Sequence, residues 1–362
     1  MTAPLPVNAE IEFNGPDQSV QPPDDSVRLL DRVEAGGADV RGLYAHVPFC
    51  FHKCHYCDFY SIVDDGGRQV QFTDRLTGEL RSLGRRAGRP LESIFVGGGT
   101  PTLLATPLWR RLLRTIDEAF DLADGLEFTV EANPETVTAE LLGALVEGGV
   151  NRLSIGAQSF DPRHLKTLER WHDPANVGRA VELARAAGID EINLDLIFGI
   201  PGQGVADWRA DLDRAIDLEP THLACYGLTY EPGTAMTRKR ELGRIEATAE
   251  SIEAAMYETT IDRLGEAGFA HYEISNWARA EGAADHRCRH NLMYWRNGSW
   301  LAAGPSGSGH VAGLRWRNAP HLGRYLAWAG EGAPVAPGSV ERLDASASVG
   351  EHFMLRLRLR EG

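Results

Sequence analysis

The strongest constraint on the fold is a regular alternation of short β-rich runs with segments of helical apolar spacing, beginning near residue 41. Six runs predict strands, at 42–47, 93–96, 127–131, 152–157, 191–198 and 222–229. The segments between them predict helices, at 68–84, 105–120, 138–148, 174–187 and 205–218. Strands that alternate with helices at this spacing form right-handed βαβ units, so the sequence predicts an α/β fold around a parallel sheet.

Glycines mark the ends of several predicted helices, as at Gly148, Gly149 and Gly188, where a helix commonly closes in the left-handed conformation. Six strands are fewer than the eight of a complete (β/α)₈ barrel. A partial (β/α)₆ barrel and an open doubly wound sheet are therefore the two candidate architectures.

The pattern changes after Tyr230. A helix is predicted at 247–267, and an aromatic-rich stretch follows it that holds five of the eight tryptophans. The first 40 residues combine several prolines with acidic and small residues, a composition that buries little surface. We therefore expect a mobile tail at 1–40, a core domain at 41–270 and an appended C-terminal α+β module at 271–362.

Composition excludes several functions. The net charge is −14, which argues against a nucleic-acid-binding surface and against electrostatic docking to anionic lipid. No apolar run reaches the roughly 18 residues of a membrane span, and the N-terminus has no apolar core of a secretory signal. The five cysteines, an odd number with three clustered, do not suggest a disulfide framework. We expect a cytoplasmic protein.

Three cysteines, Cys50, Cys54 and Cys57, lie within eight residues directly after the first predicted strand. Each thiolate could bind one iron of a four-iron cluster, which would leave the fourth iron open to a small molecule. A zinc site completed by His52 or His55 is the alternative. The loop follows the carboxyl end of a strand in a βα array, where reactive sites are built, and this context favours iron and sulfur.

The ends of the next two strands carry groups that suit a ligand. Gly98 and Gly99 would let a ligand approach the backbone amides closely, and Thr100 adds a hydroxyl. Glu131 could accept hydrogen bonds from an amino or ribose group; an exposed carboxylate at a strand end is an equally weighted alternative.

Asp195 lies inside an apolar strand, where a charge is costly unless it is paired or faces a ligand. Gln158 ends the preceding strand. Arg170 could pair with Asp195, meet the carboxylate of a ligand or lie on the surface.

The C-terminal region contains the run His290-Asn291-Leu-Met-Tyr294-Trp295. Histidine can ligate haem iron, and the two aromatic rings could stack on a flat macrocycle. On chemistry alone, a packed aromatic cluster around a hydrogen-bonded histidine is the stronger interpretation. Cys225 is expected in the core, whereas Cys288 could be a core residue, a free thiol or a second soft ligand.

These motifs together resemble the radical S-adenosylmethionine superfamily, specifically the branch of oxygen-independent coproporphyrinogen III oxidase (HemN) and the haem chaperone HemW. The resemblance extends from about Tyr44 to Leu359 and implies a partial (β/α)₆ barrel. It implies that Cys50, Cys54 and Cys57 hold a [4Fe–4S] cluster. It further implies that S-adenosylmethionine contacts the positions matching the family's binding residues, Tyr44, Tyr56, Gly98, Gly99, Thr100, Glu131, Gln158, Arg170 and Asp195.

Two features point to the chaperone. The oxidase has a further cysteine two residues after the third, where this chain has Phe59. The run that begins at His290 resembles the HNxxYW haem-binding motif, which implies haem bound by His290, Asn291, Tyr294 and Trp295. The resemblance therefore implies haem transfer to acceptor proteins, with membrane-associated respiratory enzymes as candidates, and an electron donor to the cluster. The alternative is an enzyme of porphyrin metabolism, either the oxidase or a methyltransferase.

Two departures from the family pattern concern the C-terminal region. The segment from Gly304 to His310 is longer than the compact Gly-Ala-His of the chaperones, which leaves the role of His310 open. The sequence ends at Gly362, where relatives continue into a small further domain, so we expect the C-terminal module to be truncated relative to the family.

Overall fold

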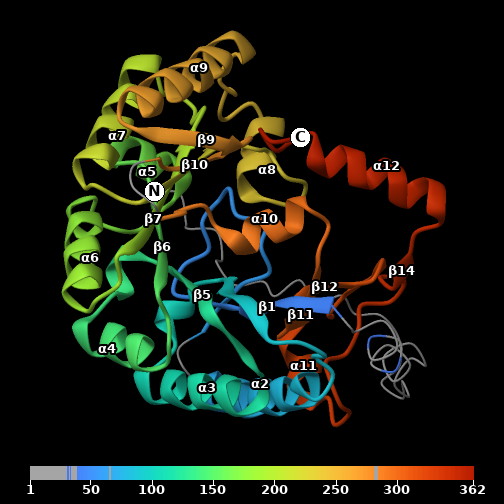
Figure 1. Cartoon of the computed structure of the whole chain (residues 1–362). Coiled ribbons are helices and arrows are strands. Elements are labelled where there is room, and N and C mark those ends of the chain that lie inside the picture. The colour runs from blue at the N-terminus through green and yellow to red at the C-terminus, as the bar shows by residue number, and fades with distance from the viewer. Residues whose placement is uncertain (1–30, 32, 34–38, 65–66, 281–283) are drawn as a thin grey trace.

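A twelve-stranded mixed sheet organises the computed structural model, which describes residues 31, 33, 39–64, 67–280 and 284–362 (Figure 1). Six of its strands are parallel and follow one another across the sheet in chain order: β1 (Val40–Val47), β4 (Leu91–Gly98), β5 (Leu122–Ala132), β6 (Arg152–Gln158), β7 (Glu191–Phe198) and β8 (His222–Gly227). A doubly wound sheet reverses its strand order, and these six strands do not. The predicted α/β fold of the partial-barrel type is confirmed.

All five helices predicted between the strands are present. They are α2 (Gln69–Gly84), α3 (Thr106–Ala119), α4 (Ala139–Glu147), α6 (Ala175–Ala186) and α7 (Val205–Asp217). They lie along the outside of the strands (Figure 1). Helices α4 and α6 end just before glycines with positive φ, Gly149 at 88° and Gly188 at 93°, as the sequence predicted.

Several elements were not predicted. Helices α5 (Pro162–Leu168) and α8 (Ala235–Glu241) have seven residues each, which is too short for a clear helical period. Two 3₁₀ turns, η2 (Pro101–Leu103) and η3 (Pro134–Thr136), follow β4 and β5, and a two-stranded sheet pairs β2 (Phe49–Cys50) with β3 (Ile62–Val63).

The C-terminal residues extend the same sheet at both edges. After α9 (Glu250–Glu266), strands β9 (Phe269–Glu273) and β10 (Asn276–Arg279) add antiparallel to β8. At the other edge β11 (Ser299–Ala303) runs parallel to β1. Antiparallel strands then follow, with two more helices: β12 (Ser308–Val311), β13 (Leu314–Arg317), α11 (Leu322–Ala327), β14 (Glu341–Arg342) and α12 (Ala345–Arg356).

One short helix, α10 (Arg289–Trp295), connects these two additions, and it contacts β4. It carries the run that begins at His290. Because β10 and β11 lie near opposite ends of the sheet, the chain between them must cross the sheet.

Most of the stretch predicted as a mobile tail, 1–40, lies outside the described residues. Val33 and Val40, which are described, are fully buried. Among the helices that the structure describes, none has the length and apolar character to cross a membrane.

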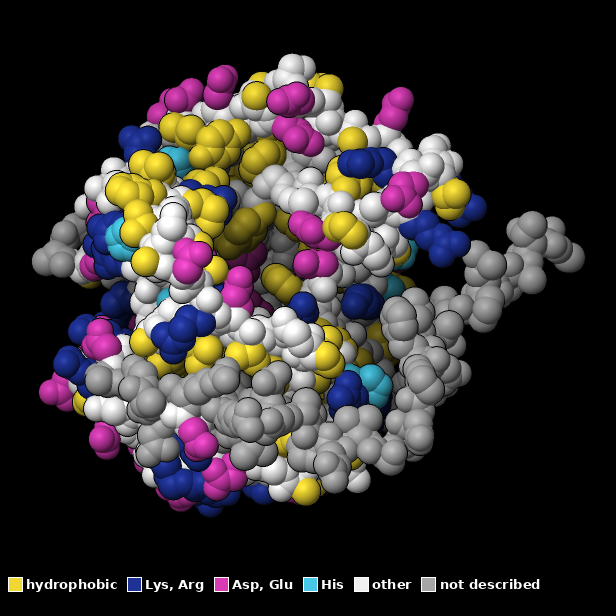
Figure 2. All heavy atoms as spheres, turned by 90° about the vertical axis from the view of Figure 1, so that its right-hand side faces the viewer, with side chains coloured by type: hydrophobic (Ala, Val, Ile, Leu, Met, Phe, Trp, Pro, Cys, Tyr) yellow, Lys and Arg dark blue, Asp and Glu magenta, His cyan; other side chains and the backbone are white. Residues whose placement is uncertain are grey.

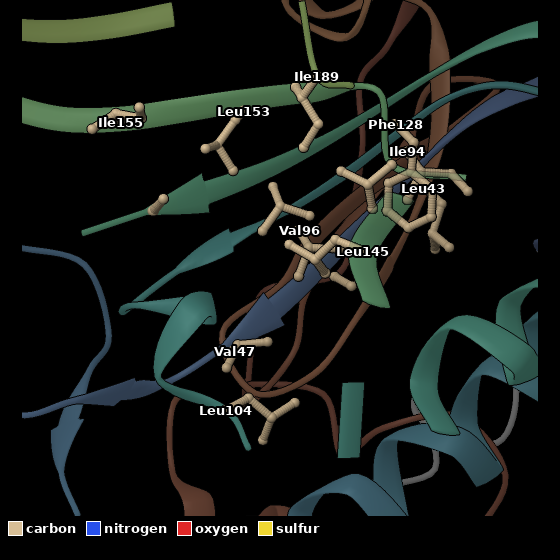
Figure 3. Packing of buried hydrophobic residues seen from close by; sticks show 14 of the residues in the cluster. Leu43, Val47, Ile94, Val96, Leu104, Phe128, Leu145, Leu153, Ile155 and Ile189 are labelled. Carbon is tan, nitrogen blue, oxygen red and sulfur yellow. The ribbon is translucent and has the colours of Figure 1, made fainter. Parts of the chain in front are cut away.

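The core lies between the outer face of the parallel strands and the helices. Leu43, Ile94 and Phe128 come from β1, β4 and β5, pair in register and pack together (Figure 3). Each is at most 1% exposed, and burial of such a side chain contributes about 1.5–3 kcal/mol. Since side chains alternate along a strand, the neighbouring residues point to the opposite, inner face.

Candidate functional site

The inner face of the parallel sheet is polar. Alternate residues of β5 to β8 line cavities there: Thr129, Glu131, Arg152, Ser154, Asn193, Asp195, His222 and Tyr226. Only Glu131 and Asp195 of this set were predicted from the sequence as site residues. The sequence did contain a signal for the other six residues. On each strand the two cavity-lining residues are two or four positions apart, which places their side chains on the same face of the sheet.

Two adjoining cavities share this face. The outer cavity, of about 430 Å³, lies at the carboxyl ends of the strands and includes the cysteine loop. The inner chamber, of about 540 Å³, reaches the first residues of β6 and β8 and the helix α10. Gly98, Glu131 and Asp195 line both, so a ligand in one lies beside a ligand in the other. The face drawn in Figure 2 is hollowed near its middle, with acidic side chains visible inside the hollow.

The three clustered cysteines all line the outer cavity, and none forms a disulfide. Cys50 Sγ lies 3.6 Å from Thr100 Oγ1, and Arg170 Nη1 lies 3.9 Å from Cys54 Sγ. Burial raises the pKa of Cys50, and it raises the pKa of Cys57 to about 11. Thiolates in this loop therefore need a strong positive charge beside them, as a metal centre supplies.

The two histidines of the zinc alternative differ: a lysine donates to His55, whereas His52 lines the outer cavity and its Nε2 has no hydrogen-bond partner among the described residues. The His52 ring stacks on Trp171 with ring centroids 4.0 Å apart, and Lys239 Nζ donates to His55 Nδ1 at 2.9 Å. Within the described part of the chain, no three His, Cys, Asp or Glu side chains are arranged around a single ion.

The glycine turn after β4 brings the backbone against Glu131. A Cβ on Gly97 would lie 2.8 Å from the Glu131 carboxyl carbon, and Gly98 has a φ of 113°. The Gly98 amide donates to Glu131 Oε2 at 2.9 Å. Burial raises the pKa of Glu131 to about 7, although the Gly98 hydrogen bond opposes the shift. This carboxyl group can accept or donate a hydrogen bond near neutral pH.

Asp195 is held within the sheet. It accepts hydrogen bonds from Ser154 Oγ at 3.0 Å and from Asn193 Nδ2 at 2.8 Å, and burial raises its pKa. Arg170 donates to the Gly156 carbonyl at 3.0 Å, while its buried Nε has no hydrogen-bond partner among the described residues. Arg170 thus has a free donor beside the cysteine loop.

The remaining residues expected to contact S-adenosylmethionine divide between the two cavities. Tyr56, Gly99, Thr100 and Gln158 line the outer cavity with Arg170. Tyr44 lines the inner chamber instead, and its hydroxyl lies 3.0 Å from His46 Nδ1.

His290 lies in the wall of the inner chamber. Its Nδ1 is 2.9 Å from Ser93 Oγ, its Nε2 is 2.8 Å from the Tyr294 hydroxyl, and its ring stacks on Phe95. Burial lowers the pKa of His290 to about 3. The imidazole is therefore neutral at physiological pH, as a metal ligand must be.

Two buried carboxylates hold α10 against the sheet. Glu127 accepts from the backbone amides of Arg289 at 2.8 Å and His290 at 3.0 Å. Glu273 accepts from Asn291 Nδ2 at 3.2 Å. Asn291 lines the chamber beside His290. Neither glutamate was predicted from the sequence as a site residue, because the partners of both lie on a separate helix, α10.

Trp295 lies apart from the other three motif residues. It is not among the residues that line the chamber; it packs with Leu292 and Leu359, and the Arg358 guanidinium lies 5.3 Å from its ring. Successive residues on a helix point about 100° apart, so Tyr294 and Trp295 face different surroundings.

The residues with open roles are all buried. Cys225 belongs to the core, as expected. Cys288 lines the inner chamber, and its Sγ lies 3.5 Å from Glu127 Oε1. His310 Nδ1 donates to the Gly298 carbonyl at 2.8 Å, and its ring meets Trp300 edge to face.

Comparison with known proteins agrees with this geometry. The model of the radical SAM superfamily matches residues 44–215. The haem chaperone HemW of Mycobacterium tuberculosis is 39% identical over 326 residues, which cover 89% of this chain and 82% of the relative. HemW of Escherichia coli is 36% identical, with 88% and 82% covered. Coproporphyrinogen III oxidase (HemN) from Escherichia coli, a radical SAM enzyme, has a TM-score of 0.78 at 22% identity over 91% of this chain and 78% of its own, which shows a common fold.

The fold and the site therefore define a radical SAM protein, a class that carries a [4Fe–4S] cluster and S-adenosylmethionine. The similarity to curated relatives over most of both chains shows that the chain belongs to the HemW haem-chaperone family.

Proposed function

We propose that this chain is a haem carrier, which binds haem in the inner chamber and passes it to acceptor proteins. The observation that carries this proposal is a buried, neutral His290 in the wall of a chamber of about 540 Å³. Asn291 and Tyr294 line the same wall. Iron ligation by His290 Nε2 requires the Tyr294 hydroxyl to move away.

The outer cavity suits the two cofactors of the class. Cys50, Cys54 and Cys57 would hold the [4Fe–4S] cluster, because their free thiols line one cavity and need a metal charge. When reduced, such a cluster supplies one electron to the sulfonium of S-adenosylmethionine. The free Nε of Arg170 suits the carboxylate of that molecule.

The other groups of the outer cavity would orient S-adenosylmethionine. The turn at Gly98 and Gly99 lets a ligand approach the backbone, and Glu131 suits an amino or ribose group. Tyr56, Thr100, Gln158 and Asp195 complete the wall, with Tyr44 behind it in the inner chamber.

One exposed aromatic side chain is shared by the two cavities. Phe59 lines both cavities and is 58% exposed, so it offers a surface for haem to pass to an acceptor. We propose a cytoplasmic carrier whose acceptors include membrane-associated respiratory enzymes, with a separate electron donor reducing the cluster.

A radical SAM enzyme of porphyrin metabolism is the second candidate. The observation that favours it is the shared wall of Gly98, Glu131 and Asp195, which places a ligand in the inner chamber beside S-adenosylmethionine. The class of reaction would be oxidative decarboxylation of a porphyrinogen or methyl transfer. Phe59 in place of a further cysteine argues against the oxidase.

Haem titration of the anaerobically purified protein tests the proposal, with 5′-deoxyadenosine measured in the same samples. We expect His290→Ala to weaken haem binding by at least about tenfold, since it removes the iron ligand. His352→Ala, on the exposed face of α12, is the matched control. Equal affinity of His290→Ala and the wild type would refute the haem site. Formation of 5′-deoxyadenosine that depends on a porphyrinogen would favour the enzyme.

A further inference from the structure

Two polar atoms without partners lie on adjacent strands in the inner chamber. Thr129 on β5 and Arg152 on β6 are paired in register, and both line the chamber. Thr129 is 1% exposed and Arg152 is 2% exposed. Among the described residues, Thr129 Oγ1 and Arg152 Nη2 have no hydrogen-bond partner.

The rest of the Arg152 guanidinium is held by the protein. Its Nη1 donates to the His286 carbonyl at 3.2 Å and lies 3.4 Å from Glu191 Oε2. Glu191 also meets His286 Nδ1 at 2.7 Å and accepts from Thr221 Oγ1 at 3.0 Å, so its charge is shared among three partners. The protein thus fixes one end of the guanidinium and leaves Nη2 available.

Neighbouring polar groups are satisfied, which sets this pair apart. His222 Nδ1 lies 2.6 Å from Asn193 Oδ1, and His222 Nε2 lies 2.9 Å from the Tyr272 hydroxyl. Asn193 also donates to Ser154 Oγ at 2.7 Å. A buried donor that lacks an acceptor costs free energy. Such donors therefore indicate a position where a bound ligand supplies the missing acceptor.

We propose that Arg152 and Thr129 together bind a carboxylate of the ligand in the inner chamber. A guanidinium N–H and a hydroxyl on neighbouring strands can donate to the two oxygens of one carboxylate. The negative charge of the carboxylate strengthens both bonds, and the positive charge of the guanidinium strengthens the first further. This inference rests on the proposed function, in which the ligand is haem; the group bound is then a propionate.

A purely structural role for Arg152 would be to balance the charges of the buried Glu127 and the partly exposed Glu191. That role accounts for its charge, but it leaves the unpartnered Thr129 hydroxyl on the adjacent strand unexplained. The two roles make different predictions for a ligand whose carboxylates are blocked.

The test compares haem with haem dimethyl ester, whose propionates cannot carry charge, in anaerobic titrations of the full chain. The wild type should bind haem about tenfold more tightly than the ester. Thr129→Val, which keeps the side-chain shape, should reduce this preference several-fold, and Arg152→Gln should abolish it. Thr73→Val is the matched control, because Thr73 is a buried threonine on α2 whose hydroxyl donates to the Gln69 carbonyl.

Each outcome has a distinct meaning. Equal binding of haem and ester by the wild type, or an unchanged preference in Thr129→Val, would overturn the carboxylate anchor while haem binding itself stands. Failure of the wild type to bind either compound would overturn the proposed function instead. Thermal unfolding shows whether Arg152→Gln is folded. If it is not, the preference of Thr129→Val for haem over the ester alone decides whether the carboxylate anchor exists.

Discussion

The carboxylate of Glu127 on β5 accepts a hydrogen bond from the backbone amide of His290 at 3.0 Å, across 163 residues of sequence. The same carboxylate also accepts a hydrogen bond from the backbone amide of Arg289. One side chain of the sheet therefore caps the helix that carries His290. Helix α10 has only seven residues and cannot be stable in isolation. Its position in the chamber wall therefore depends on tertiary contacts, of which this cap is one.

Glu127→Ala tests the cap. The change leaves two backbone amides without their acceptor, so we expect the free energy of unfolding to fall by about 2 kcal/mol and haem binding to weaken. Urea denaturation measures the first effect and haem titration the second. Glu118→Ala removes an exposed glutamate 3.8 Å from Arg81 and should change stability by less than about 0.5 kcal/mol. Comparable stability of the two variants would argue against the cap.

Tyr294→Phe tests whether His290 Nε2 is the iron ligand. The variant removes the hydroxyl that now occupies this nitrogen, so haem affinity should rise by about two- to tenfold, the worth of one hydrogen bond. The measurement is an absorbance titration with haem. Tyr230→Phe is the control, because that hydroxyl has no hydrogen-bond partner among the described residues. Unchanged affinity in Tyr294→Phe would mean that iron does not bind at Nε2.

Arg170→Gln should weaken S-adenosylmethionine binding by about ten- to a hundredfold, because it removes the cation expected to meet the carboxylate. Calorimetric titration of the cluster-loaded protein measures this effect. Arg209→Gln, at an exposed position on α7, should bind as the wild type does. The assignment fails if both variants bind S-adenosylmethionine equally well.

The buried His290 should make stability depend on pH. Its pKa is lowered from 6.5 to about 3 in the folded protein, so below pH 6.5 the unfolded chain takes up a proton that the folded chain does not. His290 therefore lowers the free energy of unfolding as the pH falls, by up to about 1.4 kcal/mol per pH unit. Between about pH 6 and pH 4, the unfolding free energy of His290→Gln should fall less steeply than that of the wild type. His352→Gln should follow the wild type, and parallel slopes for His290→Gln and the wild type would contradict the shift.

Much of the outer cavity was predictable from the sequence, and the reason is geometric. Parallel strands bring their carboxyl ends to one edge, so motifs that follow successive strands must meet there. Cys50, Gly98, Glu131 and Asp195 share one cavity for this reason. The strand predicted at 191–198 is β7 with the same bounds, because a long apolar run between turn residues is a strong signal.

The inner chamber was not predictable in the same way. His290 and Ser93 are 197 residues apart in sequence, and no local pattern announces their hydrogen bond. The motif suggested that Tyr294 and Trp295 act together, yet helix geometry places only Tyr294 in the chamber.

By itself the sequence determined the α/β class, the strand order of local βαβ units and the cysteine loop, since these depend on residues close in the chain. Only the tertiary structure decided where α10 lies and which polar groups are left without partners. A helix of seven residues has no preferred position of its own, so contacts with distant strands place it. The same holds for Thr129 and Arg152, whose alignment depends on the register between two strands rather than on either strand alone.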